Sequence, residues 1–163
     1  MIKRLRDIKK RYLFVLFGLI ISILVYANFN FSKEYEMSIG ELIDLAQKDD
    51  DEAQFMLGAF YQQGIQVNVD LQESVKWYKR SAMNGNTYAM INLGNMYNEG
   101  KGVEQDSFKA FDWNLEAAKK GDASGMFNVS KKYEYGIGVE IDLEKAKYWG
   151  EKAEKLKNAN DKS

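Results

Sequence analysis

Residues 87–122 read TYAMINLGNMYNEGKGVEQDSFKAFDWNLEAAKKGD, and this stretch decides the fold because its pattern occurs three times in the chain. The tryptophans show the period: Trp77, Trp113 and Trp149 are the only three in the sequence, and each lies 36 residues from the next. A fixed period of this length is typical of repeat architectures. Four further columns are identical in all copies: Tyr61, Tyr97 and Tyr133; Gly64, Gly100 and Gly136; Val67, Val103 and Val139; Asp70, Asp106 and Asp142. The sequence therefore predicts three units, 51–86, 87–122 and 123–158.

Each unit is predicted to form two helices. The first helix of a unit (helix A) follows an N-cap residue and the second (helix B) follows an aspartate, because these side chains accept from the free amides of a first turn. A glycine ends helix A, because glycine readily adopts the left-handed conformation found there. These residues are Asp50, Asn86 and Asp122; Gly64, Gly100 and Gly136; and Asp70, Asp106 and Asp142. With no proline and no alternating β-branched run, the fold class is all-α: an alpha-alpha solenoid of about three 36-residue helix-turn-helix repeats.

Flanking segments complete the organisation of the chain. Residues 39–50 match the helix-B register of a missing unit and predict a capping helix, whereas residues 159–163 are a polar tail. Within a unit, the stripe of Ala53 and Leu57 is expected to face that of Trp77 on helix B, and the small residues Gly58 and Gly94 allow close approach.

The N-terminus predicts a transmembrane helix. Residues 1–12 hold six bases against Asp7, and residues 13–29 are free of charge, long enough to just span a bilayer. The positive-inside bias predicts a single pass through the inner (cytoplasmic) membrane with the N-terminus inside, a linker at 30–38, and the repeats in the periplasm or another extracytoplasmic space. The alternative is a signal peptide cleaved near Ala27, with secretion to the periplasm.

Composition limits the possible chemistry. The chain has no Cys and no His, which excludes thiolate nucleophiles, imidazole bases and most transition-metal sites, so we expect no metal and no small-molecule cofactor. Beyond the basic segment, 151 residues carry 17 basic and 23 acidic groups, a net charge of −6, so nucleic acid is not an expected partner. These observations favour a binding protein over an enzyme.

The repeat resembles the Sel-1-like repeat, a relative of the tetratricopeptide solenoid. The residues that carry the resemblance in the second unit are Ala89, Leu93-Gly94, Tyr97, Gly100-Lys101-Gly102-Val103, Asp106, Ala110, Trp113, Ala117-Ala118 and Gly121. Departures include Gln66 in the column of Gly102, Ser130 in the column of Gly94, and apolar positions occupied by Lys131 and Lys132. The resemblance implies protein–protein recognition, as in adaptors of lumenal quality control and scaffolds of the bacterial envelope.

The candidate binding surface is the stripe of helix A opposite the core, where a groove would receive another protein or peptide. It comprises Glu52, Phe55, Ala59 and Gln62; Tyr88, Ile91, Asn95 and Asn98; and Ser124, Phe127, Lys131 and Glu134. The alternative for its apolar column is packing between adjacent units.

The predicted function is therefore a membrane-anchored, exported protein-interaction module, an adaptor or scaffold of the cell envelope. An immunity protein that neutralises a secreted toxin is the first alternative. An alternative of another class is a carboxylate-dependent envelope hydrolase, which no pair of acids on an apolar patch supports.

Overall fold

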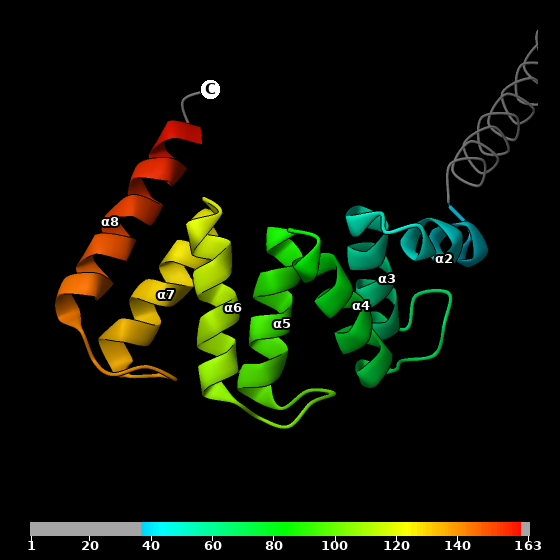
Figure 1. The fold of residues 1–163 in the computed structure, drawn as a ribbon, viewed down its shortest axis with the longest axis horizontal. Coiled ribbons are helices and arrows are strands. Elements are labelled where there is room, and N and C mark those ends of the chain that lie inside the picture. Colours follow the sequence, from blue (N-terminus) through cyan, green and yellow to red (C-terminus); the bar gives the residue numbers. More distant parts are fainter. Residues whose placement is uncertain (1–36, 161–163) are drawn as a thin grey trace, which may run out of the picture. The chain divides into compact units, whose positions relative to one another are not determined.

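The structure, a computed structural model, describes residues 37–160, and all regular secondary structure in this range is helical. The predicted basic segment 1–12, apolar segment 13–29 and most of the linker lie outside the described residues, as do residues 161–163. The helices are α2 (Ile39–Gln47), α3 (Asp51–Gln63), α4 (Leu71–Met83), α5 (Thr87–Glu99), α6 (Ser107–Lys119), α7 (Ala123–Tyr135) and α8 (Leu143–Asn160) (Figure 1). The prediction of an all-α repeat solenoid is confirmed. None of these described helices is both long and apolar enough to cross a membrane.

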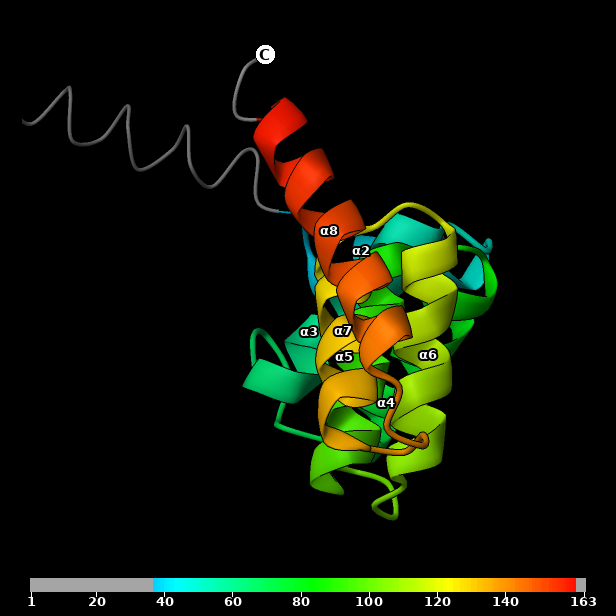
Figure 2. The same cartoon turned by 90° about the vertical axis from the view of Figure 1, so that its left-hand side faces the viewer.

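The helices alternate between two layers. Helices A are α3, α5 and α7, helices B are α4, α6 and α8, and α2 occupies the place of a helix B before the first repeat. Each helix packs on the next one along the chain, and α5 also contacts α7. Figure 2 shows α3, α5 and α7 on one side and α4 and α6 on the other. One surface of the stack is therefore made by helices A alone.

The predicted capping residues hold the helix ends. The three N-cap side chains of helices A accept from the backbone N–H three residues on, at 2.8–3.0 Å: Asp50 from Ala53, Asn86 from Ala89 and Asp122 from Gly125. The closing glycines Gly64, Gly100 and Gly136 have φ of 75°, 67° and 69°. Asp70, Asp106 and Asp142 accept at the start of helices B from Glu73, Lys109 and Lys145.

Helices A and B of one repeat meet at a position that has no room for two side chains. A Cβ added to Gly58 would lie 2.7 Å from Cδ1 of Tyr78, and one added to Gly94 would lie 2.6 Å from Nδ2 of Asn114. The third repeat reverses the arrangement, because Gly150 on α8 faces Ser130 on α7 and its added Cβ would lie 3.1 Å from the serine Oγ. The expected close approach is confirmed.

The tryptophans are half-buried, and in the first two repeats the residue after each is the largest fully buried side chain of its helix B. Tyr78 and Asn114 are each 1% exposed, whereas Trp77, Trp113 and Trp149 pack against the core from its edge. The tryptophans therefore lie on the core-facing stripe of helix B, where each indole covers the edge of the helix pair.

Loops between helix A and helix B dock on the preceding helix B. Gly102 has φ 71°, and a Cβ there would lie 2.2 Å from the carbonyl oxygen of Leu71 at the start of α4. Gln66 occupies the same column with φ 58°. It fits because α2 begins four residues later in the repeat than α4 does. The Gln66 side-chain oxygen accepts at 3.0 Å from the first amide of α2, that of Ile39.

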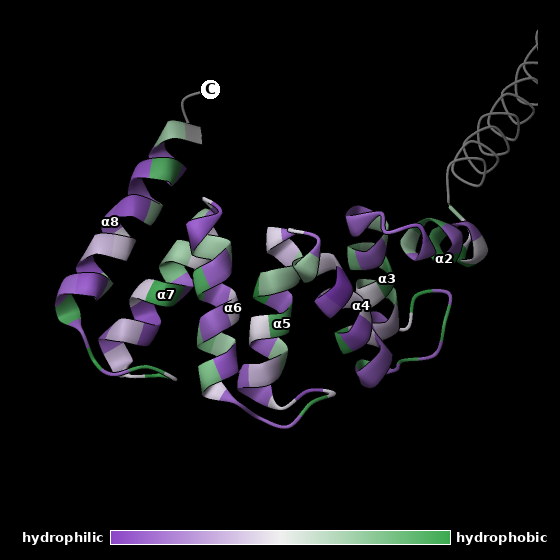
Figure 3. Ribbon diagram, viewed as in Figure 1, coloured by the Kyte–Doolittle hydropathy of each residue, from purple (hydrophilic) through white to green (hydrophobic). Residues whose placement is uncertain are grey.

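The last helix is longer than the other helices B because the residue that ends them is absent. Gly85 and Gly121 follow α4 and α6 with φ of 106° and 93°, and Lys157 stands in their column. Helix α8 therefore continues to Asn160, into the segment predicted as tail. Lys147 and Glu154 occupy columns that are apolar and buried in the inner repeats, and Figure 3 shows α8 as largely hydrophilic. This polarity is typical of a terminal repeat.

The close approach predicts that Gly94→Ala destabilises the fold. An exposed helical Gly→Ala change stabilises by about 1 kcal/mol, but here the methyl group clashes with Asn114, so we expect a net loss of about 1–3 kcal/mol. Adding Asn114→Gly, which copies Gly150 of the third repeat, should recover about 1 kcal/mol or more of that loss as a coupling energy. Urea unfolding of both single variants and the double variant measures this cycle. Gly94→Ala with stability above wild type would contradict the packing described.

Candidate functional site

The twelve residues predicted as a binding surface lie on α3, α5 and α7, and none is fully buried. We call them the helix-A face. Glu52, Tyr88, Asn95, Ser124 and Phe127 are exposed, and Phe55, Ala59, Gln62, Ile91, Asn98, Lys131 and Glu134 are half-buried. Solvent therefore reaches this face on every repeat.

The apolar column of the face comprises Phe55, Ile91 and Phe127. Two of these residues pack between units, and the third is available to a partner. Phe55 and Ile91 pack against the core cluster that contains Tyr78 and Leu93, as packing between units requires. Phe127 is 53% exposed, because α7 is the last helix A and no further helix covers it in the described part of the chain. Of this column, Phe127 is the residue most available to a partner.

Aromatic contacts shape the N-terminal part of the face. The ring of Phe55 lies 5.8 Å from that of Tyr78 and 6.0 Å from that of Tyr88, in tilted arrangements. The Tyr78 hydroxyl donates to Gln62 Oε1 at 2.8 Å, and burial raises the pKa of Tyr78. Tyr88 keeps 65% of its surface exposed. It is thus a fixed, amphipathic ring that a partner can contact.

An ion pair lies on the C-terminal part of the face. Lys131 Nζ is 2.7 Å from Glu134 Oε2, and the ammonium also lies 5.8 Å from the ring centre of Phe127. The hydrogen bond raises the pKa of Lys131 and lowers the pKa of Glu134. Both groups are ionised at neutral pH and largely neutralise each other.

Lys132, next in sequence, is a buried cation that the binding-surface prediction omitted. It is 8% exposed, and its Nζ lies 3.4 Å from Oδ1 of Asn98 on α5. Burial lowers the pKa of Lys132. The signal available in the sequence is the repeat column, which holds Phe60 and Met96 in the first two units.

An open groove of about 890 Å³ lies between α7 and α8. Ser124, Phe127 and Lys131 of the helix-A face line it, together with α8 residues that the sequence analysis did not include: Gly150, Ala153, Glu154 and Lys157. The corresponding place in the inner repeats is filled by the next helix A, where Gly125 lies against Ala117. Gly150, in the column of Tyr78 and Asn114, adds no side chain to the lining of this groove.

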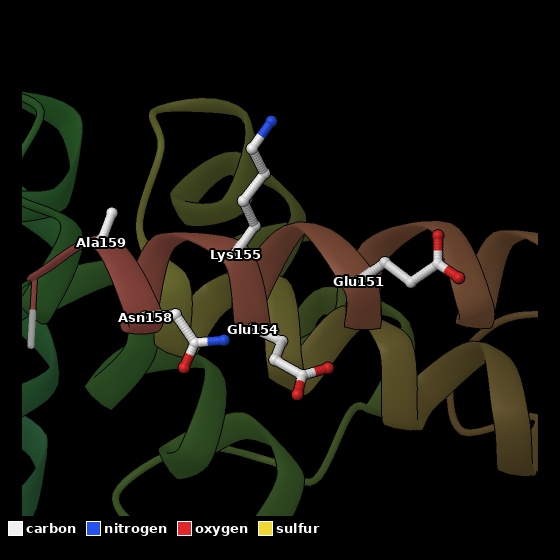
Figure 4. A pocket seen from close by; sticks show the side chains of 5 residues that line it. All are labelled: Glu151, Glu154, Lys155, Asn158 and Ala159. Carbon is white, nitrogen blue, oxygen red and sulfur yellow. The ribbon is translucent and has the colours of Figure 1, made fainter.

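A second hollow, of about 490 Å³, offers no converging groups. It is lined by Glu151, Glu154, Lys155, Asn158 and Ala159, all from α8. In Figure 4, Lys155 points away from Glu154 and Asn158. Within residues 37–160, no three acidic side chains come together in a way that could hold a metal ion.

Comparison with known proteins gives one family. The family model described as Sel1 repeat matches residues 51–86, 87–122 and 123–158. No curated protein matches the chain.

Solved structures share the fold. A Sel1 repeat protein from Oxalobacter formigenes is 34% identical with a TM-score of 0.68, covering 72% of this chain and 89% of that one. The protein c5321, a protective antigen present in uropathogenic Escherichia coli strains, is 34% identical with a TM-score of 0.70 over 72% of this chain, which spans 25% of its length. Cysteine rich protein B of Helicobacter pylori is similar in fold, with 23% identity and a TM-score of 0.57 over 72% of this chain and 90% of that one. With three matched repeats that make up most of its length, the chain belongs to the Sel1 repeat family.

Proposed function

We propose that this chain is a membrane-anchored, exported interaction module, an adaptor or scaffold of the cell envelope, that binds a protein or peptide on its helix-A face. Sel1 repeats are in general non-catalytic modules for protein interaction. The observation that supports this particular surface is Phe127, an aromatic side chain 53% exposed on the wall of an open groove. Aromatic anchors beside a pocket supply most of the energy in protein interfaces.

The chemistry of the face suits a peptide better than a reaction. Its exposed aromatic rings, Tyr88 and Phe127, can bury apolar side chains, and Asn95 and Ser124 can hydrogen-bond to a peptide backbone. Gly150 and Ala153 contribute no bulky side chain to the α8 side of the groove. A helix or an extended segment could lie along it.

The proposal includes the topology expected from the sequence. Six bases precede the apolar residues 13–29, and Lys33 is the first base after them, which favours a single pass with the N-terminus in the cytoplasm. The repeats would then face the periplasm or another extracytoplasmic space. Cleavage near Ala27, giving a secreted product, is the alternative for this segment.

Phe127→Ala should lower partner capture about tenfold or more, because an interface anchor contributes at least ~1.4 kcal/mol. Its stability should change by about 1 kcal/mol or less, since half of the ring is exposed. The matched control is Phe108→Ala, which removes a 73% exposed ring from α6 in the other layer. The measurement is the amount of protein crosslinked to the full-length chain in membranes, with thermal unfolding of each variant.

The Phe108→Ala control shows which layer of helices contacts the partner. Loss of capture with Phe108→Ala and not with Phe127→Ala would place the partner on helices B and contradict the proposed face. If both variants capture as well as wild type, neither aromatic residue is an anchor and the proposed role of Phe127 is contradicted.

Topology is tested by reporters fused after Ser163. A reporter active only in the periplasm should work and one active only in the cytoplasm should not. An uncleaved anchor also predicts that the protein keeps Met1 and stays in membranes at high salt, because apolar insertion does not depend on counterions. A product that begins at Asn28 would establish cleavage, and an active cytoplasmic reporter would overturn export.

A further inference from the structure

Lys132 is a cation at a position that the repeat uses for core packing. Met96, in the same column of the second unit, is 1% exposed and its sulfur lies 3.9 Å from Ser74 Oγ of the preceding helix B. Lys132 is itself 8% exposed. Removing an ammonium from water is costly unless hydrogen bonds and an opposite charge replace the water.

The described residues supply few of the hydrogen bonds, and none of the opposite charge, that would replace water around the Lys132 ammonium. The only acceptor within hydrogen-bond reach of Lys132 Nζ is Asn98 Oδ1, at the long distance of 3.4 Å, and Lys132 makes no ion pair in residues 37–160. An ammonium group has three donors. At least two of them are therefore left to water or to a ligand.

Neighbouring acceptors are already occupied. At the end of α5, the carbonyl of Met96 accepts from Lys101, that of Tyr97 from Asp106, and that of Asn98 from the Gln105 side chain. The carboxylates at these helix ends are paired as well: Glu99 with Lys101, Asp106 with Lys109 and Glu134 with Lys131. Within residues 37–160, Lys132 therefore has no countercharge of its own.

We propose that Lys132, positioned by Asn98, binds an aspartate or glutamate side chain of the protein partner at the C-terminal ends of α5 and α7. The proposal rests on the proposed function, because Asn98, the contact of the ammonium, belongs to the helix-A face. It deepens that function by naming the chemistry of the partner: a peptide segment with one aspartate or glutamate side chain, whose carboxylate completes the donors of Lys132.

A single carboxylate fits this place better than a polyanion. Phosphate groups are held by several cations or by arginine forks, and here one ammonium acts with one amide. The 151 residues after the basic segment have a net charge of −6, which repels a polyanion at long range. A single carboxylate carries one negative charge, which matches the one positive charge of Lys132.

The test uses random dodecapeptides displayed on phage through their C-termini, selected on the full-length chain in detergent. Peptides selected on wild type should be enriched in Asp or Glu at one position, and peptides selected on Lys132→Met should not be. The matched control is Lys79→Met, which removes an exposed, unpaired ammonium from α4 and should leave the enrichment unchanged. Display through the C-terminus removes the terminal carboxylate, so side-chain acids are the only carboxylates available.

The affinity of the best synthetic peptide then measures the coupling between its acidic residue and Lys132. Changing its selected Glu to Gln should weaken binding to wild type about tenfold to a hundredfold, as expected for a charged hydrogen bond, and binding to Lys132→Met by less than about twofold. Lys132→Met should unfold thermally at or above the wild-type midpoint, because Met is the residue that the second repeat uses. Asn98→Asp, which supplies an internal carboxylate, should abolish the preference for acid without removing the lysine.

Each other result decides against the proposal in a distinct way. Peptides that lose binding with Phe127→Ala and show no acidic preference would overturn the carboxylate site and leave the proposed surface standing. Selected peptides that are insensitive to Phe127→Ala, or no selected peptides, would overturn both. A less stable Lys132→Met that keeps the acidic preference would show that the lysine serves the fold alone.

Discussion

The constraint on which the rest of this structure depends is the place where helices A and B of each repeat touch, which admits one side chain and not two. The first two repeats put the side chain on helix B, Tyr78 or Asn114, against a glycine on helix A. The third repeat puts a serine on helix A against Gly150. Because the backbones of helices A and B approach closely here, the few atoms at the contact are tightly packed. Small changes in side-chain volume at this position are therefore costly in folding free energy. The contact fixes which side of helix A faces inward, and so which side faces solvent.

A second contact carries this arrangement from one repeat to the next. Each loop between helix A and helix B approaches the first turn of the preceding helix B so closely that Gly102 and Gly138 have no room for a Cβ. Gln66 is the exception, and it closes the first turn of α2 with its side chain. Neighbouring repeats are therefore held by backbone contacts as well as by apolar burial. Some side chains of the helix-A face add to these contacts: Phe55 and Ile91 pack between repeats, and Glu52 accepts from Asn86, the N-cap residue of the next helix A.

Local features of the fold, such as the ends of helices, could be predicted from the sequence, whereas the degree to which each side chain is buried could not. Caps such as Asp50 and Gly64 act within a few residues of chain, so a single sequence contains all the information they need. Trp113 recurs in register, yet recurrence does not say whether a side chain fills the core or covers its edge. The length of α8 could have been predicted, because Lys157 stands in the column of Gly85 and Gly121. The α7–α8 groove could not be foreseen, since it depends on which residues lack a neighbour in space.

The candidate site arises where the repeat departs from its own pattern. Phe127 has no later helix A beside it in the described part of the chain, so its ring is exposed where Phe55 and Ile91 are packed against the core. Lys132 differs from Met96 in chemistry, although both side chains are buried. The first departure follows from the number of repeats, whereas the second places a charged group where burial is costly. A residue that weakens the fold in one copy of a repeat, while its counterparts strengthen the others, is best explained by a contact made outside the fold.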